Sequence, residues 1–132
     1  MLVVEPLELR FPYDLNKKIS CSLELTNETN AYKAFNIEMM SPLPYCTEPG
    51  KGVVSPRSKC SVNVTLKPHD TSPRDIQHAC KFIVRSTKVD ELLCSEDLTK
   101  DMFIKEDGNV VDEVNLDVVF DALHYCGLIC HR

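Results

Sequence analysis

Hydrophobic and polar residues alternate along several short stretches of this chain. Every second residue is apolar over residues 17–27, 60–67 and 80–86, and the same alternation returns over residues 115–120. Because successive side chains of a strand point to opposite faces, a period of two places the apolar residues on one face. We therefore predict a half-buried strand over each of these ranges.

The stretch 34–54 begins with the same alternation but does not keep it. It breaks at residues 41–44, Ser-Pro-Leu-Pro, because two prolines lack amide donors and cannot continue a central strand. Apolar residues resume at residue 45, a Pro-Gly-Lys-Gly turn follows at 49–52, and Val53 and Val54 end the stretch. A strand that bends and changes partner is typical of two-sheet folds. We predict that the chain crosses from one sheet to the other here.

These stretches together predict an all-β fold. They amount to about seven short strands at spacings of roughly ten residues, joined by Pro, Gly and Asn turns, which favours an immunoglobulin-like β-sandwich. The chain has no tryptophan, so it is not an antibody-type domain. Residues 100–106 are the helical candidate, with Thr99 as N-cap, which predicts one short helix before the last strand. We expect one domain over residues 1–121 and a tail over residues 122–132.

The net charge and the lengths of the apolar runs argue against several classes of protein. A formal net charge of −5 argues against a general nucleic-acid binder. No apolar run approaches the roughly 20 residues that span a bilayer, and the N-terminus lacks the pattern of a secretion signal. We therefore expect a cytoplasmic protein with no membrane span in this chain.

The seven cysteines and four histidines do not form a recognisable site. Without a secretion signal, reduced thiols are expected, several of them buried, and the glycosylation-type triplets beginning at Asn27 and Asn63 are interpreted as chance. Cys126, Cys130 and a flanking histidine could hold a metal, but no second ligand pair supports them, so no metal or cofactor is expected. The histidines lie in loops or the tail, and no nucleophile elbow, metalloprotease signature or phosphate loop is present, so we predict no enzyme.

Several short segments, taken in their order along the chain, carry a family resemblance. They include Val4-Glu5-Pro6-Leu7-Glu8-Leu9-Arg10-Phe11, Leu25-Thr26-Asn27, Ala34-Phe35, Tyr45-Cys46 and Lys81-Phe82. The series resembles a major sperm protein (MSP) domain and, within that family, the VAMP-associated proteins (VAP); residues 98–113 resemble the plant members. The resemblance extends over residues 3–120 and implies a seven-stranded immunoglobulin-like sandwich. In this family a proline of the bent segment is commonly cis, which makes Pro42 or Pro44 the candidate.

The resemblance also implies a function. VAP domains are non-enzymatic adaptors that bind the FFAT motif, a short peptide with two aromatic residues in an acidic tract, on the outer face of one sheet. Their groove uses a Lys-Thr-Thr run before the bend, a Lys-Phe-Met-Val-Gln run and a lysine on the last strand. The lysines attract the acidic flank, and an apolar pocket takes the aromatic anchor.

The matching positions of this chain are altered. Glu38 begins the run that corresponds to Lys-Thr-Thr, and Asn115 stands at the final-strand lysine, so two lysines are missing. A carboxylate facing an acidic ligand repels it, which predicts weakened FFAT binding and a less acidic peptide on a Met-rich surface. The predicted peptide-binding residues are Glu38, Met39, Met40, Lys81, Ile83, Arg85, Asn115 and Asp117.

Two hypotheses about function follow. The first is an adaptor in a trafficking or membrane-contact scaffold, at the cytosolic face of the endoplasmic reticulum through partners or further segments. The alternative is a structural protein that self-associates, for example as a homodimer, through an exposed strand edge. A binding face that has lost its ligand altogether belongs with this alternative.

Overall fold

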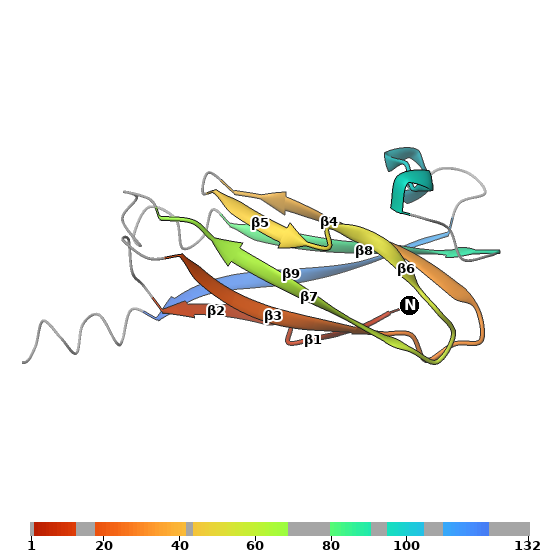
Figure 1. Ribbon diagram of the computed structural model, residues 1–132, viewed down its shortest axis with the longest axis horizontal. Coiled ribbons are helices and arrows are strands. Elements are labelled where there is room, and N and C mark those ends of the chain that lie inside the picture. Colours follow the sequence, from red (N-terminus) through yellow and green to blue (C-terminus); the bar gives the residue numbers. More distant parts are fainter. Residues whose placement is uncertain are drawn as a thin grey trace, which may run out of the picture.

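Two packed β-sheets make up the molecule (Figure 1). The computed structural model describes residues 2–12, 18–41, 44–68, 80–90, 95–104 and 110–121, and the strands of these residues pair antiparallel except β2 with β9. The four-stranded sheet has the order β1 (Val3–Glu5), β3 (Ile19–Thr26), β7 (Lys59–Leu66) and β5 (Tyr45–Glu48). The five-stranded sheet has the order β2 (Glu8–Pro12), β9 (Val111–Asp121), β8 (Lys81–Val89), β4 (Tyr32–Met40) and β6 (Lys51–Val54).

The predicted all-β sandwich is confirmed, and the predicted crossing lies where the prolines interrupt the alternation. The chain leaves the five-stranded sheet after β4 and joins the other sheet as β5. It then returns at Pro49 and Gly50 to pair β6 with β4. Pro6 separates β1 from β2 in the same way, so interruptions by proline divide the expected strands into shorter ones in different sheets.

The cis prolyl bonds of the described chain precede Pro6 and Pro49. Both prolines stand where the chain passes from one sheet to the other. The two candidates given by the resemblance are not tested, because Pro42 lies outside the described residues and Pro44 follows Leu43, which also lies outside them.

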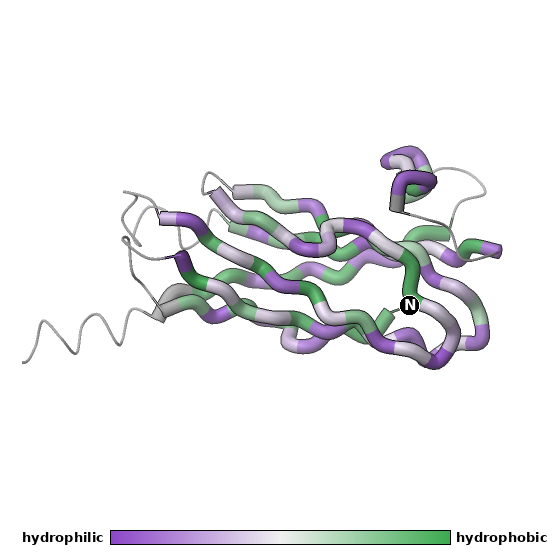
Figure 2. Tube along the Cα trace, in the orientation of Figure 1, coloured by the Kyte–Doolittle hydropathy of each residue, from purple (hydrophilic) through white to green (hydrophobic). Residues whose placement is uncertain are grey.

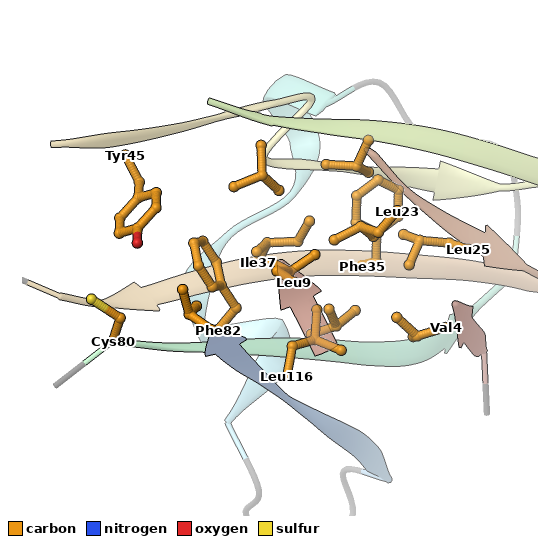
Figure 3. Close-up of a cluster of buried hydrophobic side chains, with 14 of the residues drawn as sticks. Val4, Leu9, Leu23, Leu25, Phe35, Ile37, Tyr45, Cys80, Phe82 and Leu116 are labelled. Carbon is orange, nitrogen blue, oxygen red and sulfur yellow. The ribbon is translucent and has the colours of Figure 1, made fainter. Parts of the chain in front are cut away.

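The core lies between the sheets and is built from the alternating apolar residues. Figure 2 shows hydrophobic and hydrophilic positions following one another along the strands. Figure 3 shows Phe82, Leu9 and Leu116 of the five-stranded sheet pointing into the same interior as Tyr45 and Leu23 of the other sheet. The ring centroids of Tyr45 and Phe82 lie 5.1 Å apart, edge to face.

The side chain of Asn27 is fully buried, and it organises the turn after β3. Its Nδ2 donates to the carbonyl oxygens of Ala31 at 2.7 Å and Val54 at 3.0 Å, while its Oδ1 accepts from the Thr29 hydroxyl at 2.7 Å. The Asn-x-Thr triplet therefore has a structural cause: both side chains satisfy backbone groups in a tight turn.

Four cysteines lie within the described residues, in or beside strands, and all four are free: Cys21, Cys46, Cys60 and Cys80. Cys80 is buried and Cys46 is exposed. Burial raises the pKa of the Cys21 thiol to about 11. Cys94, Cys126 and Cys130 lie outside the described residues, and reduced thiols stay a prediction.

The helical prediction for residues 100–106 was only partly right. The chain forms two short 3-10 helices, η1 (Ser95–Asp97) and η2 (Lys100–Phe103), and residues 105–109 lie outside the described part. Thr99 does precede η2, and its backbone N–H donates to Met102 Sδ at 3.5 Å. Ile104 takes extended backbone angles, which ends the helix after a single turn.

Candidate functional site

Seven of the eight predicted binding residues lie on the outer face of the five-stranded sheet. β8 lies between β4 and β9, so the register extends across all three strands (Figure 1). Glu38 lies beside Ile83, which lies beside Asn115. Residues in register point to the same face. We call this set the outer patch: Glu38, Met40, Lys81, Ile83, Arg85, Asn115 and Asp117.

The row nearest the bend combines an exposed apolar side chain with two opposite charges. Met40 lies beside Lys81, and Lys81 lies beside Asp117. Met40 is 51% exposed. This end of the outer patch is therefore open to solvent.

Met39 does not belong to the outer patch. It lies in register with Phe82 and Leu116, both of which are buried in the core, so it points to the inner face. It is 37% exposed nonetheless, because it stands near the end of β4. The alternation of β4 placed this residue correctly with Phe35 and Ile37, whereas the family resemblance grouped it with its two neighbours.

Arg85 is held between two glutamates. Its Nη1 donates to Glu38 Oε2 in a short ion pair, and its Nε donates to Glu113 Oε1 at 3.3 Å. The hydrogen bond that Arg85 donates to Glu38 is the first cause that raises the pKa of Arg85 above its ordinary value. Two carboxylates of the protein therefore already bind the Arg85 guanidinium, and the side chain is only 22% exposed.

A short segment covers the sheet beside the outer patch. Leu98 and Phe103 of residues 95–104, the covering segment, pack with Ala34 in a second buried cluster. Lys51 fixes the segment by donating from Nζ to the Leu98 carbonyl at 3.1 Å. Figure 1 shows the two short helices of this segment near one end of the molecule.

A groove opens where the covering segment ends. Its volume is about 590 Å³, and it contains Glu38 and Arg85 of the outer patch. The sequence did not predict the groove. The lining residues other than Glu38 and Arg85 come from β4, the covering segment and β9, which are far apart along the chain. The lining residues are Asn36, Ile37, Glu38, Arg85, Lys100, Phe103, Ile104 and Glu113.

Comparison with protein families decides the relationship. The profile of the MSP (Major sperm protein) domain matches residues 1–108. This chain belongs to the MSP domain family. The expected MSP domain is thus confirmed over most of the described sandwich.

The relatives of this MSP domain include plant proteins. It is 42% identical over 121 residues to vesicle-associated protein 1-1 of Arabidopsis thaliana, covering 92% of this chain and 47% of that protein. It is 38% identical over 120 residues to vesicle-associated protein 3-1 of the same plant, covering 91% of this chain and 80% of that protein. The predicted likeness to the plant VAP-type members is confirmed. The chain spans about half the length of vesicle-associated proteins 1-1 and 1-2.

Solved structures support the fold. WR4, an MSP family member of C. elegans, has a TM-score of 0.65 at 17% identity, covering 91% of this chain and 97% of that one. The YadV chaperone has a TM-score of 0.59 at 12% identity, covering 91% of this chain and 52% of that one. At these identities the likeness is one of fold alone.

Three further predictions concern a metal site, a membrane span and self-association. Within the described ranges, no group of three or more His, Cys, Asp or Glu residues could hold a metal ion. Cys126, Cys130 and the four histidines lie outside those ranges. No helix in the described part of the chain has the length and apolar character needed to cross a membrane. Self-association stays a prediction; the strands at the sheet edges are β1, β5, β2 and β6.

Proposed function

We propose that this MSP domain is a non-enzymatic adaptor module that binds short peptide segments of partner proteins on its outer patch. The observation that carries the proposal is the register of β4, β8 and β9, which puts the seven residues of the outer patch on one face, beside a groove of about 590 Å³. A small number of apolar anchors in such a surface can supply most of the binding free energy.

The outer patch and groove offer the two kinds of contact that a peptide needs. Ile104 on the covering segment and Ile83 on the sheet provide apolar surface for an anchor side chain, and the nearly buried Phe103 lines the groove beside Ile104. Met40 extends that surface, and a flexible methionine adapts to differently shaped partners. The charges around it fix orientation more than they add affinity.

The setting of this function is also a proposal. Relatives named vesicle-associated proteins support a role in membrane trafficking or in a contact scaffold. The domain would act in the cytoplasm, at the cytosolic face of the endoplasmic reticulum, where partners or further segments hold it. Peptides of the FFAT type would bind weakly, because Glu38 and Asn115 stand where lysines are expected.

A display library of random peptides tests this proposal directly. Peptides enriched on the wild-type domain are titrated against Met40→Asp with Ile83→Asp. We expect affinity to fall by roughly thirtyfold or more, because two anchor contacts become buried charges. The matched control is Ser20→Asp with Ser22→Asp, which adds the same charges to the outer face of the four-stranded sheet and should leave affinity unchanged.

Two outcomes would contradict the proposal. If the outer-patch variant binds as tightly as the wild type, the peptide site lies elsewhere on the domain. If no peptide is enriched, peptide binding is not the function, and concentration-dependent light scattering then tests self-association through the sheet edges.

A further inference from the structure

We infer that the outer patch selects an uncharged peptide segment with an apolar anchor, and that Glu38 sets this selectivity by occupying Arg85. The inference rests on the proposed peptide-binding function and names the chemistry of its ligand. Three features carry it: the pairing of Arg85, the balance of charge in the groove, and the apolar surface on both sides of it.

Glu38 stands in the place of a ligand carboxylate. An arginine commonly receives a carboxylate through two parallel donors of its guanidinium. The donors of Arg85 are instead divided, Nη1 to Glu38 and Nε to Glu113. The two acids come from the strands on either side of β8, so a carboxylate from each neighbouring strand engages Arg85. An incoming carboxylate must displace one of them or approach a like charge.

Besides Arg85, the basic residue that lines the groove is Lys100, which belongs to the covering segment at the side of the groove. Lys51 does not line the groove, and it donates its amine to the Leu98 carbonyl. The lining residues comprise Glu38 and Glu113 against Arg85 and Lys100, so the formal charges balance. A surface whose charges are already balanced is complementary to a segment that brings no net charge.

Apolar surface borders these paired charges. Ile104 is 44% exposed beside the groove, and Phe103 lines it from the same segment. Ile83 lies between Glu38 and Asn115 on the sheet and is only partly covered. An aromatic or long aliphatic side chain can therefore contact both the covering segment and β8 without displacing the ion pairs. The ligand that fits this site is therefore a peptide with an apolar anchor side chain and uncharged flanking residues.

The test is a titration with three synthetic peptides that share one Phe-Phe anchor. The anchor is flanked by glutamates in the first peptide, by glutamines in the second and by lysines in the third. We expect the wild-type domain to bind the glutamine-flanked peptide most tightly and the glutamate-flanked peptide about tenfold more weakly. Tightest binding of either charged peptide would overturn the inference, while the proposed peptide-binding function would stand.

The same series on Glu38→Gln tests the role of Glu38. The amide keeps the shape of the side chain but removes the carboxylate that competes for Arg85. Affinity for the glutamate-flanked peptide should rise about tenfold, and affinity for the glutamine-flanked peptide should stay within about twofold. The matched control is Glu24→Gln, which removes the equivalent charge of the Glu24–Lys59 pair on the other sheet and should change neither affinity.

The remaining outcomes separate the inference from the function on which it rests. If Glu38→Gln leaves the affinity for the glutamate-flanked peptide unchanged, Glu38 does not set the selectivity. If none of the three peptides binds either the wild type or Glu38→Gln, the proposed peptide-binding function itself fails. Both substitutions replace solvent-accessible carboxylates, so each variant is expected to fold, which its circular dichroism spectrum would verify.

Discussion

The outer faces of the two sheets follow the same alternation but differ in what their side chains do. On the four-stranded sheet, short polar side chains pair across neighbouring strands. Ser20 and Thr65 share a hydrogen bond of 2.9 Å, and Ser22 donates to Asn63 at 3.0 Å. These groups satisfy one another, so this face has little left to offer a partner.

The outer face of the five-stranded sheet carries longer side chains. Arg85 reaches to glutamates on both neighbouring strands, and Met40 stands exposed. The covering segment buries one end of this face and leaves a groove at its edge. A strand pattern therefore says which residues point outward, but side-chain length and tertiary cover decide whether the face is closed or available for binding.

Phe103→Ala should have the largest effect, because Phe103 anchors the covering segment to the five-stranded sheet. Phe103 is 4% exposed and packs on Ala34, so its truncation should lower the free energy of unfolding by about 3 kcal/mol. Urea denaturation measures this. Ile104→Ala is the control, since Ile104 is largely exposed and should cost less than about 1 kcal/mol. Equal costs would mean that the covering segment is not packed as described.

The two sides of the four-stranded sheet should differ in thiol reactivity. Burial raises the pKa of Cys21 to about 11 from an ordinary value of 9.0, so at about pH 8 its thiolate fraction is roughly a hundredfold lower than for an ordinary thiol. Cys46 on the outer face is exposed and should be alkylated first. Mass spectrometry of iodoacetamide-treated protein distinguishes them, and preferential labelling of Cys21 would contradict this prediction.

The same thiol links stability to pH. The folded chain favours protonated Cys21, because its folded pKa lies above the ordinary value. Its contribution is therefore fully present below pH 9.0 and is lost as the pH rises toward about 11. In Cys21→Ser the decline of melting temperature over this window should be smaller than in the wild type.

Lysines added to the outer face of one sheet or the other test which face attracts an acidic peptide. Glu38→Lys with Asn115→Lys restores lysines to the outer patch and should raise affinity for an FFAT peptide about tenfold. Glu24→Lys with Ser61→Lys makes the same change of charge on two register partners of the other sheet. If both variants gain equally, net charge rather than the outer patch attracts the peptide. Tight binding by the wild type would show that these lysines are dispensable.

The smallest effect is expected from the ion pair of the four-stranded sheet. Lys59 Nζ and Glu24 Oε1 lie 3.4 Å apart with both side chains well exposed, so Glu24→Gln should change the free energy of unfolding by less than about 0.5 kcal/mol. Glu38→Gln should cost more, about 1 kcal/mol, because a neutral amide binds the less exposed arginine more weakly than a carboxylate does. Thermal or urea unfolding of both variants tests the difference.

Much of the fold follows from local pattern. β3, β7 and β8 form where the alternation over residues 17–27, 60–67 and 80–86 predicts strands, because every second residue must be buried to hide apolar surface. The prolines at 6, 44 and 49 stand beside strand ends because they lack an amide donor. The same alternation placed Met39 on the inner face. The helix over residues 100–106 was overestimated, because contact of Phe103 with the sheet competes with local helix propensity.

The sequence by itself determined which residues point outward and which family the chain resembles. Only the tertiary structure decided what those outward residues do together. Glu38, Arg85 and Glu113 belong to three strands that are far apart along the chain, and their ion pairs exist because β8 lies between the other two strands. The groove likewise depends on where residues 95–104 pack. Register and packing are long-range properties, so a local pattern does not contain them.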